Sequence, residues 1–291
     1  MIAWLSEPSC RDTGLVGGKA AALGLLSNEH RVPAAFCITT RAFDDLPAAH
    51  SMATGLPSSW VEAVMGAYAE LGRVCGVSEP RVAVRSSAMD EDSGHASFAG
   101  QHASFLNVGA DGLVRAVLDC RMSCASNPAI RSYRARRGLP GDAGSVAVLV
   151  QLLIPADWSA VVFTADPVDP GLDDLLINAT WGLGESLVQG TVTPDTYRVP
   201  RADGAPVASR IGSKDRMTVL SECGVRELPV PRALRARAVL RDMDLRELAL
   251  LGLSLERRLG TPVDVECASH NDQIYLLQCR PITSQECKVP T

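Results

Sequence analysis

VAVRSSAMDEDSGHASFAGQHASFLNV, residues 82–108, begins as an apolar strand and continues into a loop of small and polar residues. Val82, Ala83 and Val84 lead directly to Arg85, so the sequence predicts a cation fixed at the end of a buried strand. In the ASFAGQ part, small side chains leave backbone N–H groups uncovered. An arginine beside bare backbone amides can hold a polyphosphate without a Walker loop. The alternative is an ordinary turn with a surface ion pair.

Composition narrows the class of protein. Of the 291 residues, 46% are hydrophobic and 21% are charged, which is typical of a globular chain long enough for two domains or for one large domain with lobes. The formal net charge of −5 argues against a nucleic-acid binder, because affinity for a phosphate backbone needs a surplus of Lys and Arg.

The sequence also suggests a compartment. The start, MIAWLSEPSCRD, carries acidic residues early and has no cationic segment, so we expect no signal peptide. The whole sequence contains no run of about 18 apolar residues that could span a membrane. Among the nine cysteines only Cys120 and Cys124 are a close pair, and neither a zinc pattern nor a secreted disulfide framework fits. We therefore expect reduced thiols and a cytoplasmic location.

Residues 14–26, GLVGGKAAALGLL, predict a glycine turn followed by a helix. Lys19 falls in the first turn of this helix, where backbone N–H groups point outward and where a cation is unfavourable unless an anion lies nearby. Lys19 could therefore reach a terminal phosphate. The alternative is a solvated lysine at a helix start. The sequence has neither a Walker motif nor a GxGxxG motif.

Periodicity and capping residues predict elements that carry no chemistry of their own. They are a strand at 36–39, helices near 58–74 and 110–125, a helix from Pro128 to just before Gly138, and a long helix from Pro231 to Leu259 that Gly260 ends. We expect the arginines of the last two helices to form solvated faces. The alternative, for the helix from Pro128, is that one of its arginines points into a phosphate site.

Residues 145–168 predict two strands, and the first is apolar throughout until Gln151. A single side-chain amide at the end of an apolar strand, followed by exposed backbone, could form hydrogen bonds to the edge of an adenine. The alternative is a buried glutamine that the sheet satisfies. Further on, the GLGES and TPD turns present Glu185 and Asp195 as candidates to orient a substrate.

TPVDVECASHNDQIYLLQCRPIT, residues 261–283, predicts a β-hairpin that turns at His270–Asp272. With this turn, Glu266 faces Gln278 and Asp264 faces Arg280, so all four share one face of the hairpin. We expect Val263, Val265, Tyr275 and Leu277 on the other face. Carboxylate and amide oxygens beside an arginine form a Mg²⁺ site next to a phosphate clamp. The alternative is a solvated hairpin face with one ion pair.

Six segments occur in the order found in one family and resemble it together: GLVGGKAAALG, PAAFCITTRAF, residues 82–108, VVFTADPV, WGLGESLVQGTVTPDTY and QIYLLQCRPIT. They resemble the ATP-binding domain of the pyruvate phosphate dikinase and phosphoenolpyruvate synthase family, most of all its rifampin phosphotransferase branch. The resemblance implies an ATP-grasp fold, in which α/β lobes clasp Mg-ATP between two sheets. We expect lobes at 1–80, 81–200 and 201–291.

The resemblance also implies roles for individual residues. Lys19 and Arg85 match phosphate-binding residues, Gly100 and Ser104 match positions that close over the phosphates, and Arg280 matches the γ-phosphate arginine. The predicted nucleotide site further includes Gln151 with Leu152 and Ile154 of the segment that follows it. Glu266 and Gln278 match the residues that hold the metal.

The sequence departs from the family pattern in three places. It has no TxxGGxxxH-like motif, and none of its five histidines stands in such a context. The region between Thr40 and Val82 is shorter than usual, and His95 stands where the family tends to have Asp or Ala. We therefore expect an enzyme that transfers a phosphoryl group from Mg-ATP directly to a small-molecule acceptor. The alternatives are one half of a split dikinase that phosphorylates a histidine on a separate carrier protein, and a non-catalytic nucleotide-binding module.

Overall fold

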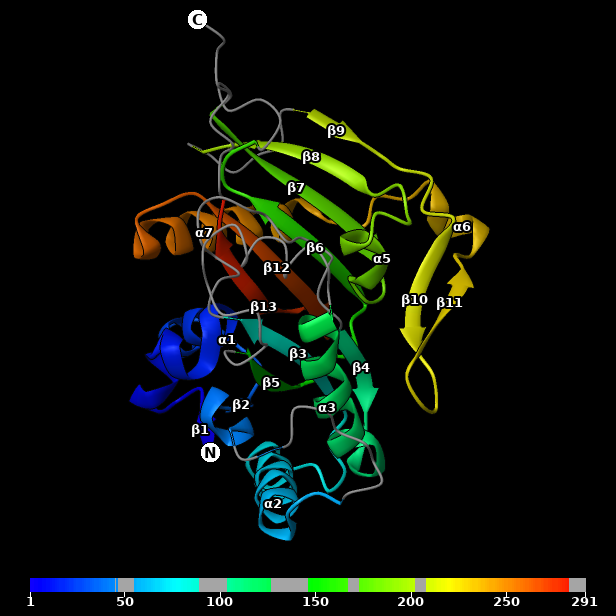
Figure 1. Cartoon of the computed structure of the whole chain (residues 1–291). Coiled ribbons are helices and arrows are strands. Elements are labelled where there is room, and N and C mark those ends of the chain that lie inside the picture. The colour runs from blue at the N-terminus through cyan, green and yellow to red at the C-terminus, as the bar shows by residue number, and fades with distance from the viewer. Residues whose placement is uncertain are drawn as a thin grey trace, which may run out of the picture. The chain divides into compact units, whose positions relative to one another are not determined.

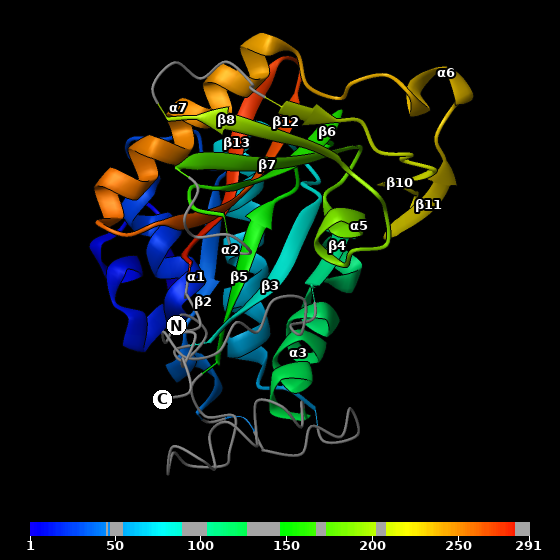
Figure 2. The same ribbon diagram turned by 90° about the horizontal axis from the view of Figure 1, so that it is seen from above.

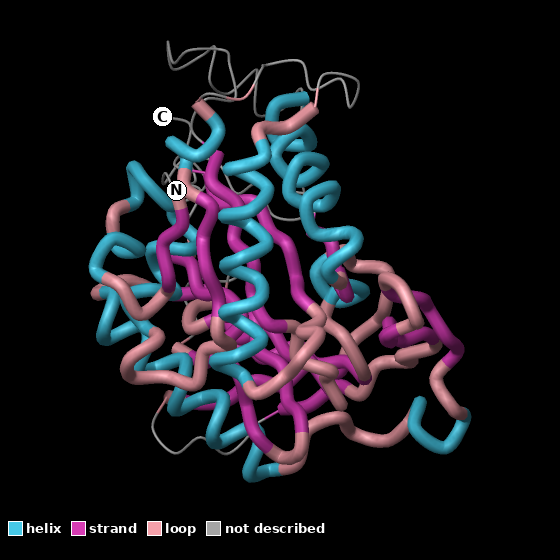
Figure 3. The backbone as a smooth tube through the Cα atoms, turned by 90° about the horizontal axis from the view of Figure 1, so that it is seen from below, coloured by secondary structure: helices cyan, strands magenta, loops and turns pink. Residues whose placement is uncertain are grey.

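The computed structural model describes residues 1–44, 46, 55–88, 104–126, 146–166, 173–201 and 208–282. Helices and antiparallel sheets make up these residues (Figures 1 and 3), so the predicted mixed α/β class is confirmed. The predicted helix from Pro128, together with Gly100 and His95, lies outside the described residues. No helix in the described ranges is long and apolar enough to cross a membrane.

The chain divides into two compact units, and each is described by itself. The first unit consists of Met1–Glu91, Phe98–Leu153 and Leu220–Val225. The second consists of Asp92–Ser97, Ile154–Val219 and Arg226–Thr291. The division into three lobes stays a prediction.

The first unit is built on a five-stranded antiparallel sheet (Figure 2). Its strand order is β1 (Ile2–Trp4), β2 (Ala35–Ile38), β5 (Val146–Leu152), β3 (Val82–Ala88) and β4 (Ser104–Val108). The central strand β5 reads VAVLVQL and is buried along almost its whole length, as expected for a strand covered on both faces. The prediction that Arg85 stands at the end of the strand that starts at Val82 is wrong, because β3 pairs with β5 as far as Ala88.

Helices cover both faces of this sheet. Helices α2 (Ser58–Cys75) and α3 (Ala110–Ser126) pack on one face, where Ile38, Val84 and Val148 join Leu71 and Leu113 in a single apolar cluster. Helix α1 (Thr13–Leu26) packs on the opposite face, against residues that alternate with these along the strands. Two short 3₁₀ helices flank α1 and β2, at Pro8–Arg11 and Thr40–Phe43.

The second unit is built on a six-stranded antiparallel sheet. Its strand order is β13 (Gln273–Pro281), β12 (Val263–His270), β6 (Trp158–Phe163), β7 (Asp174–Trp181), β8 (Asp195–Pro200) and β9 (Ala208–Arg210). Helix α7 (Asp242–Leu259) covers one face, and a Cβ added at Gly252 of this helix would lie 3.1 Å from the Val162 side chain and 3.4 Å from that of Leu175. We call the opposite face of the sheet, which carries residues alternating with Val162 and Leu175, the far face.

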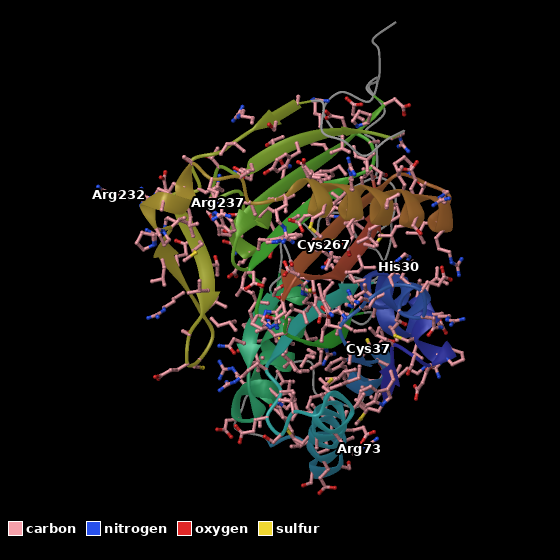
Figure 4. All side chains as sticks on the ribbon, turned by 180° about the vertical axis from the view of Figure 1, so that it is seen from behind. His30, Cys37, Arg73, Arg232, Arg237 and Cys267 are labelled. Carbon is pink, nitrogen blue, oxygen red and sulfur yellow. The ribbon has the colours of Figure 1, made fainter. Side chains whose placement is uncertain are left out.

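A small hairpin and two short helices complete this part of the chain: β10 (Arg216–Leu220), β11 (Val225–Pro229), α5 (Glu185–Val188) and α6 (Arg232–Arg235). The predicted continuous helix 231–259 is wrong, because it breaks between α6 and α7. The Val239 N–H donates to Asp195 Oδ2 at 2.8 Å, and the Arg241 N–H donates to Asp244 Oδ2 at 2.8 Å as the cap of α7. Arg232 and Arg237 in and after α6 are exposed, as predicted (Figure 4).

Candidate functional site

The β12–β13 hairpin has the predicted register in the half that is farther from its turn. Glu266 pairs with Gln278 and Asp264 pairs with Arg280, so the four side chains lie on one face of the hairpin. Asn271 and Asp272 form the two-residue turn with φ values of 51° and 57°, as a type I′ turn requires. Val265 pairs with Val162 of β6, which lies on the α7 side, and this places the four polar residues on the far face.

One part of the hairpin prediction is wrong. A bulge between Glu266 and Cys267 shifts the register, so that Cys267 pairs with Leu276 and Ala268 pairs with Tyr275. Tyr275 therefore shares the face of Glu266, and Leu276 takes the buried position that was expected for its neighbours. An extra residue in one strand reverses the alternation beyond it.

Arg280 and Asp264 form a close ion pair on this face. Arg280 donates from Nε and Nη2 to Asp264 Oδ2 at 2.8 and 2.5 Å. Burial raises the pKa of Asp264 above its ordinary value, the Arg280 guanidinium lowers it in part, and Glu266 raises it further. The arginine is held in place by its partner, which suits a group that must meet an anion in one position.

Glu266 and Gln278 are suitable ligands for Mg²⁺. Their oxygen atoms come from directly opposite residues of neighbouring strands. Mg²⁺ in nucleotide sites is usually held by one or two side chains together with phosphate oxygens and water, and not by a complete protein cage. The described residues contain no group of three or more His, Cys, Asp or Glu that could hold a metal ion.

In the first unit, Lys19 stands at a helix start, as predicted. Gly17 interrupts α1 with φ 75° and ψ 171°, and the Ala20 N–H after it donates to Ser87 Oγ at 3.1 Å. A Cβ at Gly17 would lie 2.1 Å from the Ser87 carbonyl oxygen, so only glycine fits there. The Lys19 side chain is buried, and the alternative of a solvated lysine is therefore wrong.

Arg85 lies in the middle of β3, and the register brings three predicted site residues of the strands, Arg85, Ser104 and Gln151, to one face. Arg85 pairs with Ser104 of β4 on one side and with Leu149 of β5 on the other. Gln151 pairs with Ala83, two residues before Arg85, and so shares the face of Arg85. Ser87, which accepts the hydrogen bond from α1, is on the same face. Three strands and a helix start thus bring four predicted site residues to the α1 face.

Gln151 is buried, but the sheet does not satisfy it. Its side-chain nitrogen, Nε2, is buried and has no hydrogen-bond partner among the described residues. A buried donor without an acceptor is rare in folded proteins and calls for a water or a ligand. The alternative of a glutamine satisfied within the sheet is therefore wrong. Leu152 ends β5 and Ile154 follows it, as expected.

Asp195 is not available to orient a substrate. It is fully buried and forms an ion pair with Lys214, which is also fully buried. Its two oxygens also accept hydrogen bonds from Gly212 N and Val239 N, both at 2.8 Å, and from Tyr197 Oη at 3.2 Å. The sequence prediction missed Lys214, because no local pattern distinguishes a buried lysine from a solvated one.

Glu185 remains a candidate for an interaction with a substrate. It begins α5 directly after the GLG turn and is half-buried. Burial raises its pKa above the ordinary value, and the nearby Glu227 raises it further. The turn before it is held by Gly182, which has a φ of 74° and lies so close to Thr218 that an added Cβ would be 2.4 Å from its carbonyl oxygen.

Comparison with known proteins identifies the family to which the chain belongs. Residues 48–290 match the model of the pyruvate phosphate dikinase AMP/ATP-binding domain. The chain belongs to this family. The predicted family resemblance is thus confirmed.

The relatives that the chain matches are longer than the chain itself. The probable phosphoenolpyruvate synthase of Methanocaldococcus jannaschii is 37% identical over 97% of the chain and 27% of that protein. A rifampicin phosphotransferase of a Streptomyces species is 36% identical over 92% of the chain and 34% of that protein. The chain thus spans about a third of the length of these relatives.

A solved structure with partial likeness to this ATP-binding domain is the D-alanine–D-alanine ligase of Bacillus anthracis. The alignment covers 97% of this chain and 60% of the ligase chain, with a TM-score of 0.36 and 9% sequence identity. A TM-score of this size is too low to identify a fold.

Proposed function

We propose that this chain is an ATP-grasp domain that binds Mg-ATP and transfers the terminal phosphoryl group of the ATP to an acceptor. The observation that carries the proposal is the β12–β13 register, which sets Glu266 opposite Gln278 and next to the Asp264–Arg280 pair. Membership of a family described as an AMP/ATP-binding domain supports ATP as the ligand.

Each residue predicted to bind the nucleotide has a role in this proposal. Three cations, Lys19, Arg85 and Arg280, neutralise the phosphates, and Ser104 with Gly100 closes over them. Gln151 Nε2, which has no hydrogen-bond partner among the described residues, is a suitable donor to the adenine edge, with Leu152 and Ile154 as apolar walls. Preorganised cations of this kind stabilise charge on the transferred phosphoryl group without reorganising during the reaction.

Glu266 and Gln278 would hold the Mg²⁺ ion. When bound, Mg²⁺ supplies positive charge to the phosphate oxygens of the nucleotide. The residues of the chain provide the orientation: the hairpin fixes both oxygens, and Asp264 fixes the guanidinium of Arg280 beside them.

We propose a small molecule as the direct acceptor. A relative described as a rifampicin phosphotransferase supports this class of acceptor. Glu185, half-buried and with a raised pKa, is the candidate that would orient it. We also propose a cytoplasmic location, since the cysteines in the described ranges are free thiols and most of them are buried.

Calorimetry with Mg-ATP and identification of the nucleotide product test this proposal. The wild-type chain should bind Mg-ATP, and with an accepted small molecule it should release ADP. Glu266→Ala and Arg280→Ala should lose phosphoryl transfer by at least about 100-fold, the typical effect of removing one preorganised group.

Matched controls are available on the exposed surface of α2. Glu70→Ala and Arg73→Ala remove the same side-chain types from an exposed ion pair (Figure 4) and should leave transfer unchanged. Full activity of either site variant would contradict the site assignment. Release of AMP with phosphorylation of a protein histidine would contradict the direct acceptor, and absence of Mg-ATP binding would contradict the whole proposal.

A further inference from the structure

A single row of side chains crosses the far face of the second sheet and begins at the proposed metal ligands. Paired residues on neighbouring antiparallel strands share a face, so the register can be followed from strand to strand. The row consists of Gln278, Glu266, Val161, Asn178, Thr196 and Arg210, one residue from each strand.

This row lies on the face opposite helix α7. Val162 and Leu175, which contact Gly252 of α7, alternate with members of the row along β6 and β7. After Glu266 the row passes the apolar Val161, and Asn178 is the next residue that can form hydrogen bonds.

Asn178 is held in one orientation and keeps a donor for another molecule. The Thr196 hydroxyl donates to Asn178 Oδ1 at 2.9 Å, which fixes the carboxamide. The side chain is only half-buried, and in the part of the chain that the structure describes its Nδ2 has no partner. Two residues further along β7, on the same face, the Thr180 hydroxyl is buried and also lacks a partner among the described residues.

Distance and charge indicate which part of a ligand this donor would meet. Neighbouring strands lie about 4.8 Å apart, so Asn178 stands about 10 Å from Glu266 along the row. From a metal bound at the β- and γ-phosphates of an extended nucleoside triphosphate, this distance reaches the sugar. Val161, Asn178 and Thr196 are neutral, which suits sugar hydroxyls better than phosphates, since phosphates are usually met by Lys or Arg.

We infer that Asn178, oriented by Thr196, is a nucleotide-positioning residue that donates from Nδ2 to a ribose hydroxyl oxygen of the bound nucleotide. The inference rests on the proposed binding of Mg-ATP. It assigns to the second unit a sugar contact on the same sheet row as the metal ligands.

Calorimetric titration of four ligands tests this inference: Mg-ATP, Mg-2′-deoxyATP, Mg-3′-deoxyATP and Mg-tripolyphosphate. The wild-type chain should bind ATP more tightly than one of the two deoxynucleotides. Asn178→Ala should weaken ATP binding by about 2- to 12-fold, the worth of one neutral hydrogen bond, and should lose the discrimination. Its affinity for tripolyphosphate, which has no sugar, should equal that of the wild type.

Two further variants distinguish the effect of Asn178 from the effects of other residues in the row. Thr196→Val retains Asn178 but frees its carboxamide, so it should weaken ATP binding less than Asn178→Ala while still reducing the discrimination. Arg210→Ala changes the far end of the same row and should bind all four ligands as the wild type does. The unfolding midpoint of each variant shows that it is folded.

Two results would overturn the inference alone. One is a folded Asn178→Ala variant with wild-type affinity for every ligand, and the other is an equal loss of affinity for ATP and tripolyphosphate. Failure of the wild type to bind Mg-ATP at all would overturn the proposed function together with this inference.

Discussion

Replacing Arg280 by methionine is expected to destabilise the second unit in a pH-dependent way. In the wild type, Arg280 donates two hydrogen bonds to Asp264, whose side chain is only 10% exposed. Methionine keeps an unbranched aliphatic chain but removes the cation beside the carboxylate. Removing one partner of a buried ion pair typically lowers the free energy of unfolding by about 3–5 kcal/mol.

The sign of the pH dependence follows from the pKa of Asp264. Burial raises this pKa in the folded wild type, and Arg280 offsets part of the rise, so the pKa should be higher still in the variant. A carboxyl group with a raised pKa in the folded state disfavours folding at high pH, and this penalty is relieved as the pH falls through the folded pKa. The loss of stability caused by the substitution should therefore shrink at low pH. The change is about 1.4 kcal/mol per pH unit between the folded pKa values of Asp264 in the two proteins.

Urea denaturation from pH 5 to 8 measures this effect, with hydrogen exchange of the β6 and β12 amides to report on the second unit. The double variant Asp264→Asn with Arg280→Met is the control, because it has no buried carboxylate at this position. It should regain part of the lost stability and show no added pH dependence. A loss below about 1 kcal/mol at pH 8, the size of a surface ion pair, would refute the reasoning, as would an equal loss at both ends of the pH range.

Three further predictions concern packing and thiol chemistry. Gly17→Ala should lower the unfolding midpoint strongly or prevent folding, because its Cβ would lie 2.1 Å from the Ser87 carbonyl oxygen; a wild-type midpoint in thermal unfolding would contradict this close approach. Lys214→Met should cost about 3–5 kcal/mol in urea denaturation by leaving Asp195 without its cation, and Asp195→Asn in the same chain should restore part of it. With a thiol reagent, Cys223 should react quickly in the native protein, since it is exposed, while Cys37 and Cys267 (Figure 4) should react only on unfolding, because burial raises their pKa. A Cys223→Ser variant that keeps the same number of fast-reacting thiols would contradict the last prediction.

The hairpin that carries the proposed metal ligands could be predicted in part, because its turn is fixed by local sequence. A two-residue turn at Asn271 and Asp272 fixes the pairing of the residues beside it, so counting outward sets His270 opposite Gln273 and Ala268 opposite Tyr275. Beyond Cys267 the same counting would set Glu266 opposite Leu277, and only the bulge beside Glu266, which no local pattern marks, sets it opposite Gln278. The prediction applied this outer register to the whole hairpin and therefore misplaced Tyr275. Lys19 could be placed for a similar reason, since a glycine turn before an alanine-rich helix marks a helix start.

Other features depend on partners that are distant in sequence. Asp195 resembled a turn residue exposed to substrate, but Lys214, Tyr197 and Val239 enclose it. The hydrogen bond from Val239 accompanies the break in the predicted helix between α6 and α7. The pattern of hydrophobic residues around 231–259 could not predict this break, because the acceptor, Asp195, lies in the distant strand β8.

The sequence by itself determined the mixed α/β class, the family, the helix start at Lys19 and the turn of the hairpin that carries Glu266 and Gln278. Each of these depends on neighbouring residues, on a short turn or on collinear motifs. Only the tertiary structure decided which strands lie side by side, and hence that Asn178 stands in the same row as Glu266. Strand order is set by the packing of apolar faces against helices, which is a property of the whole unit, so polar residues from distant segments come together only once that packing is known.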